Sequence, residues 1–275
     1  MFYSFPLCIQ LPACDDLEKP DFVRSMHMLA QHGFYGVELN LLDFSEKTVA
    51  SLERILAQTG LKLTMVASGA WAKQNHFSLS SADEEIRKSS VQQLCTVLDF
   101  AARFHAGVIC GFLKGGAEGD RQTAGAQMRR SIEQLCQAQA LNQAPLYLEA
   151  TNHYEALLVN TLREGCEFAR VAESAGQRLF ILPDTYHMNI EEQNTFAALT
   201  AFHDLYQNIH LSDNNRYYPG FGSIDFCAVL RVLMANGYQG TISIEGRNWA
   251  SLEEDVAVSC RYLQDAGERA SRQIY

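Results

Sequence analysis

The chain has 275 residues, of which 47% are hydrophobic and 20% charged, an ordinary composition for a globular protein. Its 22 basic and 32 acidic residues give a net charge of −10. This argues against a protein that binds nucleic acid irrespective of sequence, because affinity for the phosphate backbone comes mainly from lysine and arginine. No basic segment followed by an apolar one opens the chain, and no apolar run is long enough to span a membrane.

The eight cysteines form no C-x-x-C pair, and most of them lie within apolar helix or strand patterns. Such a distribution is typical of buried, reduced thiols, and it favours these over disulfides or a zinc site. We therefore expect a cytoplasmic protein.

Short runs rich in β-branched and aromatic residues alternate with longer amphipathic segments along the chain. Eight runs are predicted to be strands: Phe2–Leu7, Gly36–Asn40, Leu61–Ser68, Gly107–Phe112, Pro145–Ala150, Leu179–Thr185, Asn208–Ser212 and Thr241–Glu245. Eight segments are predicted to be helices: Asp21–Gln31, Glu46–Gln58, Ala82–Phe104, Gly125–Leu141, Thr161–Ala175, Thr195–Tyr206, Phe226–Ala235 and Leu252–Ala266.

Helix ends are marked by residues suited to capping. Ser81 and Ser251 are predicted N-caps, the latter with Glu254 three residues on, as in a capping box. Glycines that favour a left-handed C-terminal cap follow four of the apolar-periodic stretches: Gly33, Gly60, Gly176 and Gly237.

Strands that alternate with helices pair in parallel through right-handed crossovers, and eight such units close a (β/α)₈ TIM barrel. No linker or low-complexity segment interrupts the pattern, so we expect a single domain over residues 1–275. The rival is a doubly wound open sheet. It would normally have a glycine-rich phosphate loop after the first strand, and Leu7–Leu17 contains no glycine.

Four successive predicted strands end in a residue that can bind a metal: Glu149, Asp184, His210 and Glu245. Active sites of TIM barrels form at the carboxyl ends of the strands. These residues follow one another at intervals of about one strand–helix unit, so we expect them to converge at the barrel mouth. Three carboxylates and one imidazole suit a divalent ion such as Mn²⁺, Mg²⁺ or Co²⁺, whereas zinc more usually recruits additional nitrogen or sulfur ligands.

Three segments resemble the ketose 3-epimerases of the tagatose/psicose epimerase family, within the xylose-isomerase-like barrel superfamily. They are Leu148–Glu155 (LEATNHYE), Asp184–Glu192 (DTYHMNIEE) and His210–Gly222 (HLSDNNRYYPGFG). The resemblance at the level of motifs covers about residues 145–263. The N-terminal half fits in the order of its elements only.

The resemblance implies that the four strand-end residues bind the metal and that Glu149 and Glu245 are also the acid/base pair. We expect Mn²⁺ above Mg²⁺, Co²⁺ or Zn²⁺. On this view the enzyme epimerises a ketose at C3 by taking a proton, passing through an enediolate and returning a proton to the opposite face. Glu155, His187 and Arg216 would hold the carbonyl end of the substrate. The partner would be a small sugar or sugar phosphate, and a homodimer or homotetramer is expected.

Two departures from the family pattern concern the substrate. Gly246 and Arg247 follow Glu245 where the epimerases tend to have Pro-Phe, and the loop after the fourth strand has no tryptophan. Along a strand, Arg247 would face the same way as Glu245. Lys114, Arg216 and Arg247 are thus a candidate site for a phosphate or carboxylate. The equally open alternative is a surface lysine and an arginine paired to loop carboxylates.

Three other functions stay open on the sequence alone. An aldose–ketose or inosose-type isomerase or dehydratase would have nearly the same metal site. An apurinic-site DNA nuclease shares the barrel but needs a three-metal cluster, for which His76 and His105 are the only further candidates in the third and fourth units. A non-catalytic sugar-binding barrel would have no use for a complete acid/base pair.

Overall fold

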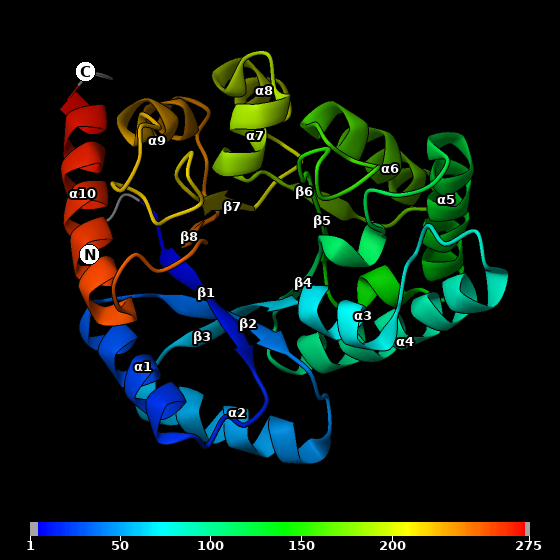
Figure 1. Ribbon diagram of the computed structural model, residues 1–275, viewed down its shortest axis with the longest axis horizontal. Helices are drawn as coiled ribbons and strands as arrows, with labels where there is room; N and C mark the ends of the chain where they lie inside the picture. Colours follow the sequence, from blue (N-terminus) through cyan, green and yellow to red (C-terminus); the bar gives the residue numbers. More distant parts are fainter. Residues whose placement is uncertain (1–4, 273–275) are drawn as a thin grey trace.

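The computed structural model describes residues 5–272, within which eight parallel strands stand at the centre and helices surround them (Figure 1). The order of the strands around the barrel is β6-β5-β4-β3-β2-β1-β8-β7. Their bounds are β1 Leu7–Cys14, β2 Gly36–Leu41, β3 Lys62–Ala67, β4 Gly107–Cys110, β5 Leu146–Glu149, β6 Leu179–Leu182, β7 Asn208–Leu211 and β8 Thr241–Ile244. The prediction of a parallel eight-stranded barrel is confirmed.

The barrel is nearly closed, and the seam lies between β6 and β7. These two strands share no continuous ladder, but Asp184 and His210 form a single parallel bridge just beyond β6. There the backbone N–H of His210 donates to the carbonyl of Pro183 at 2.9 Å. Two of the predicted metal ligands therefore stand side by side where the barrel closes.

The helices follow the strands and cover the outside of the barrel (Figure 1). Their bounds are α1 Pro20–Gln31, α2 Glu46–Thr59, α3 Gly69–Asn75, α4 Glu84–Arg103, α5 Arg121–Gln137, α6 Leu162–Ser174, α7 Thr185–Glu191, α8 Thr195–Ala201, α9 Phe226–Ala235 and α10 Leu252–Arg272, with short 3₁₀ turns at Phe112–Lys114 and Ala140–Asn142. The short helices α3 and α7 were not predicted. None of the described helices is long and apolar enough to cross a membrane.

The first strand was predicted in the wrong place. Residues 2–4 of the predicted run Phe2–Leu7 lie outside the described residues, and the strand itself begins at Leu7. Its paired residues Cys8, Ile9 and Leu11 are buried. A strand buried on both faces is a nearly continuous apolar run. Aromatic residues precede Leu7 in the sequence, and because such residues are enriched in strands, the prediction began too early.

Most of the predicted helix caps form. The four capping glycines all have φ between +66° and +79°, in the left-handed region: Gly33, Gly60, Gly176 and Gly237. Ser251 accepts a hydrogen bond from the backbone N–H of Glu254 at 3.2 Å. The Ser81 prediction was wrong. The N-cap of α4 is Asp83, whose side chain accepts hydrogen bonds from the backbone N–H groups of Glu85 and Ile86.

Apolar side chains pack in the centre of the barrel. Tyr147 stacks on Phe180 with ring centroids 5.1 Å apart, and small and aliphatic residues pack around them. A larger apolar layer lies between the strands and the helices. Because this packing fills the interior, side chains that bind a ligand are expected at the ends of the strands.

Candidate metal centre and substrate cavity

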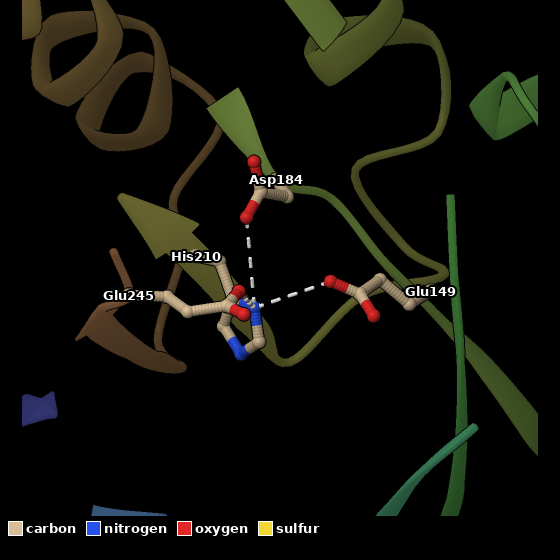
Figure 2. A group of neighbouring side chains, drawn as sticks. All are labelled: Glu149, Asp184, His210 and Glu245. Atoms are coloured by element: carbon tan, nitrogen blue, oxygen red, sulfur yellow. Dashed lines mark ion pairs between the residues drawn. The ribbon is translucent and has the colours of Figure 1, made fainter. Parts of the chain in front are cut away.

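The four strand-end residues converge at the carboxyl end of the barrel (Figure 2). Glu149 ends β5, Asp184 follows β6 and caps α7, His210 lies in β7, and Glu245 follows β8. One side-chain atom from each lies within 4.8 Å of all the others. The strand-end pattern thus brings together residues that are almost 100 positions apart.

The imidazole of His210 is at the centre of the group. Its Nδ1 lies 2.5 Å from Oε2 of Glu245, 3.5 Å from Oε1 of Glu149 and 3.8 Å from Oδ2 of Asp184. Figure 2 shows the two glutamates approaching it from opposite sides. Nδ1 of His210 and Oε2 of Glu245 are buried, and neither makes a hydrogen bond.

Buried polar atoms without a hydrogen-bond partner are rare and call for an explanation such as an ion. Here they belong to a set of three carboxylates and one imidazole, a donor set that suits a hard or borderline divalent cation. The arrangement therefore fits one metal ion, as the sequence predicts.

The charges of this group shift its ionisation in different directions. Burial would raise the pKa of Asp184, but the Arg216 guanidinium 2.7 Å away holds it well below the usual range. The pKa of Glu149 is lowered by His210 despite burial, whereas burial raises that of Glu245. Burial opposes protonation of His210, but the charges of Glu38 and then Glu245 raise its pKa well above the ordinary value.

Arg216 bridges two members of the group. Its guanidinium donates to Oδ2 of Asp184 at 2.7 Å and to Oε1 of Glu245 at 2.8 Å, and it lies 5.0 Å from the ring centre of Tyr186. The residue has φ of 65°, which is uncommon outside glycine and places it in the left-handed region. Arg216 thus fixes two carboxylates from the side that faces the cavity.

A cavity of about 310 Å³ opens onto the group, within the range of small-molecule pockets. Glu149, Glu245, Arg216, His187 and Glu155 all line it. Sequence reasoning did not single out several of the other lining residues: Gln10, Asn40, Ser68, Lys73, Gly111 and Phe112.

His187 and Glu155 are linked through one amide. Asn152 donates from Nδ2 to Oε1 of Glu155 at 3.1 Å and lies 2.8 Å from Nδ1 of His187, and its backbone N–H also points at this nitrogen. A backbone N–H can only donate, so Nδ1 of His187 is the acceptor. The neutral imidazole therefore carries its proton on Nε2.

Lys114 and Arg247 do not line the cavity. Lys114 is fully buried, where it donates to the carbonyl of Glu149 at 2.9 Å and to the Thr151 hydroxyl at 2.6 Å, and burial lowers its pKa to about 8. Arg247 is exposed. The strand alternation that placed it beside Glu245 stops at Ile244, where β8 ends. The structure therefore does not assemble Lys114, Arg216 and Arg247 into one anion site.

His76 and His105, the further candidates for a metal cluster, are both exposed. Neither belongs to the group of possible metal ligands found among residues 5–272. The described part of the chain therefore offers no support for the extra ligands that a three-metal nuclease requires.

Residues 26–266 match the family model described as the xylose isomerase-like TIM barrel. The chain belongs to the xylose isomerase-like TIM barrel family. A 3-dehydro-D-guloside 4-epimerase from Escherichia coli (strain K12) is 30% identical over 250 residues, covering 84% of this chain and 87% of that protein.

Ketose epimerases are also similar to this chain. An L-ribulose 3-epimerase from Mesorhizobium japonicum is 23% identical over 87% of this chain and 80% of its own. A solved structure of an L-ribulose 3-epimerase superposes with a TM-score of 0.83 at 21% identity, over 98% of this chain and 97% of that one. The predicted family resemblance and the isomerase class are confirmed.

Gly111 leaves room for the carboxylate of Glu149. A Cβ at this position would collide with Oε2 of Glu149. Misplacing a reacting group by about 1 Å costs on the order of 100-fold in rate. We expect Gly111→Ala to lower kcat by about that factor, measured by steady-state kinetics on an accepted sugar. Gly116→Ala is the matched control, because an added Cβ there meets no atom within 4 Å. Equal activity of the two variants would contradict the placement of Glu149.

Proposed function

We propose that the protein is a divalent-metal-dependent ketose 3-epimerase, which inverts a carbon next to a carbonyl group by removing and returning a proton. The observation that carries this proposal is the placement of Glu149 and Glu245 on opposite sides of one point (Figure 2). A carbon held between two carboxylates can lose a proton from one face and gain it on the other. A single base would return the proton to the face from which it came.

The side chains around this point have distinct roles in the proposal. Glu149, Asp184, His210 and Glu245 would hold the cation, Mn²⁺ in our proposal, which when bound polarises the sugar carbonyl and acidifies the neighbouring C–H bond. The glutamates move the proton. Arg216 keeps the Asp184 and Glu245 carboxylates oriented.

The carbonyl end of the sugar would lie against His187, which carries its proton on Nε2, with Glu155 accepting from a hydroxyl. Both side chains line the cavity, and Asn152 connects them. Donors and acceptors held in place before the reaction stabilise charge that develops on the sugar oxygens.

A second candidate is the inversion of C4 in a sugar that carries its carbonyl at C3. The observation in its favour is the 30% identity to the Escherichia coli 4-epimerase, higher than the 23% identity to the L-ribulose 3-epimerase from Mesorhizobium japonicum. Both reactions take a proton from the carbon beside a carbonyl group, so the same two glutamates serve either.

The deciding experiment incubates the Mn²⁺-loaded enzyme with free ketoses, ketose phosphates and 3-keto-glycosides, and identifies products by NMR. A C3 epimer of a ketose supports the first candidate, and a C4 epimer of a 3-keto-glycoside the second. An aldose product would instead establish the isomerase alternative. Failure of all three substrate classes with metal-loaded protein would contradict the proposal.

We further propose that Arg247 does not bind the substrate, because it is exposed and does not line the cavity. Arg247→Ala is therefore expected to change KM by less than about twofold for free and phosphorylated sugars alike, as surface substitutions usually do little. A KM that rises for phosphorylated sugars only would show that Arg247 binds a phosphate.

A further inference from the structure

We call Glu149, Asp184, His210 and Glu245 the metal group. A fourth carboxylate, which the sequence did not reveal, lies next to it. Glu38 stands in the middle of β2 with none of its surface exposed. Its Oε2 lies 2.9 Å from Nε2 of His210, the ring nitrogen that faces away from the metal group. β2 and β7 are not neighbours in the sheet, so this contact crosses the barrel interior.

Both oxygens of Glu38 have fixed partners. Asn208 donates from Nδ2 to Oε1 at 2.6 Å, and the Thr241 hydroxyl donates to Oδ1 of the same Asn208 at 2.9 Å. The contact with Thr241 sets the orientation of the Asn208 amide, so its NH₂ group has to face Glu38. Asn208 thus holds Oε1 of the carboxylate, while Oε2 accepts from Nε2 of His210 at 2.9 Å and from Nε2 of Gln10 at 3.5 Å.

Charge makes this contact specific. Within residues 5–272, His210 is the only basic side chain within 4.0 Å of Glu38. A buried carboxylate is costly unless it is paired and hydrogen-bonded. An ionised carboxylate can only accept, so the proton of a neutral His210 resides on Nε2 and the Nδ1 lone pair faces Glu149, Asp184 and Glu245.

We propose that Glu38 is a positioning residue for the metal centre: it holds His210 in the tautomer whose Nδ1 can bind a divalent cation. This inference rests on the proposed function only in assuming that a cation binds there. Hydrogen-bond partners behind metal-binding histidines fix the ring and typically account for 10- to 100-fold in metal affinity.

The test is the Mn²⁺ affinity of full-length Glu38→Gln, measured without substrate by competition with a fluorescent chelator. Glutamine has nearly the same shape, but its NH₂ group can donate to Nε2 and so favour the tautomer that places the proton on Nδ1. We expect Kd to rise about 10- to 100-fold. An unchanged Kd would overturn the inference.

Ser131→Ala is the matched control. Ser131 is a fully buried polar residue on the outer helix α5, where it donates to the carbonyl of Leu79 and accepts from Arg87. It loses buried hydrogen bonds without touching the metal group, so its Kd should equal that of the wild type. An equal loss in both variants would mean that general destabilisation explains the result, and it would overturn the inference.

A second measurement on the wild type covers the case in which Glu38→Gln does not fold. In protein labelled with ¹⁵N-histidine and loaded with diamagnetic Mg²⁺, the His210 signal, assigned by its loss in His210→Gln, should show a protonated Nε2 and an unprotonated Nδ1. Protonation at Nδ1 would overturn the inference. Wild-type protein that binds no divalent ion would instead overturn the metal centre itself, so the two failures are distinguishable.

Discussion

Glu149→Gln and Glu245→Gln are each expected to lower kcat by at least about 10²- to 10⁴-fold, the usual contribution of general acid–base catalysis. Each amide nearly preserves the shape of the side chain but cannot take a proton from carbon. Steady-state kinetics on the sugar identified by the substrate screen would measure the loss. Glu164→Gln is the control. Glu164 lies on the outer helix α6, where it forms an ion pair with Arg121 of α5, and it does not line the cavity.

Metal loss would mimic this result, because both glutamates belong to the metal group. Metal content therefore has to be measured on the same samples. A variant that retains its metal and loses activity supports a role in proton transfer. If both glutamine variants retain metal and full activity, the two-carboxylate assignment is wrong.

Asp184→Asn is expected to weaken metal binding by at least about 100-fold, the upper end of the loss seen for second-layer partners. Oδ1 of Asp184 caps α7 by accepting from the N–H groups of Tyr186 and His187, which an asparagine can still do. Oδ2 faces Arg216 and the metal group. An amide NH₂ in its place would oppose the guanidinium and supply no lone pair.

Asp225→Asn is a matched control for this substitution. Asp225 caps α9 through the N–H of Ala228 in the same manner, but it takes no part in the metal group. Titration calorimetry with Mn²⁺ should therefore show loss of binding for Asp184→Asn and normal binding for Asp225→Asn. Normal binding and activity in Asp184→Asn would remove it from the metal centre.

The four strand-end residues could be predicted because each ends or follows an apolar run. The parallel strands of a barrel bring their carboxyl ends together. That rule needs no knowledge of side-chain contacts, and it places Glu149, Asp184, His210 and Glu245 correctly at one end of the barrel. The rule fails one step further along the chain. Arg247 was placed by extending strand alternation beyond Ile244, where the strand has already ended.

Residues whose role depends on distant partners were not predictable in this way. Glu38 appears in the sequence as a single acid between Val37 and Leu39. Its partners Asn208 and His210 lie 170 and 172 residues further along the chain. A lone charge inside a strand that is otherwise buried is a signal that could have been followed, since a buried acid needs a partner. The identity of that partner requires the closed barrel.

Lys114 shows the same limit for a cation. In the sequence it stands in a loop after the fourth strand, where a lysine is usually solvated. In the folded protein the 3₁₀ turn Phe112–Lys114 directs it inward, and it binds the carbonyl of Glu149. Its burial therefore supports the end of β5 rather than a ligand in the cavity.

The central proposal is that one glutamate removes a proton from the sugar and the other returns a proton to the opposite face. Transfer of solvent deuterium to the product tests this proposal most directly. In D₂O, the wild-type enzyme should form the epimer with deuterium at the inverted carbon, because the proton that returns comes from a carboxylate in exchange with solvent. Of Glu149→Gln and Glu245→Gln, the variant that keeps the glutamate facing the C–H bond of the substrate should exchange that position without inverting it, whereas the other should not exchange it. Epimer formed by the wild type without any solvent deuterium would contradict the account and would require a hydride shift or cleavage of a carbon–carbon bond instead.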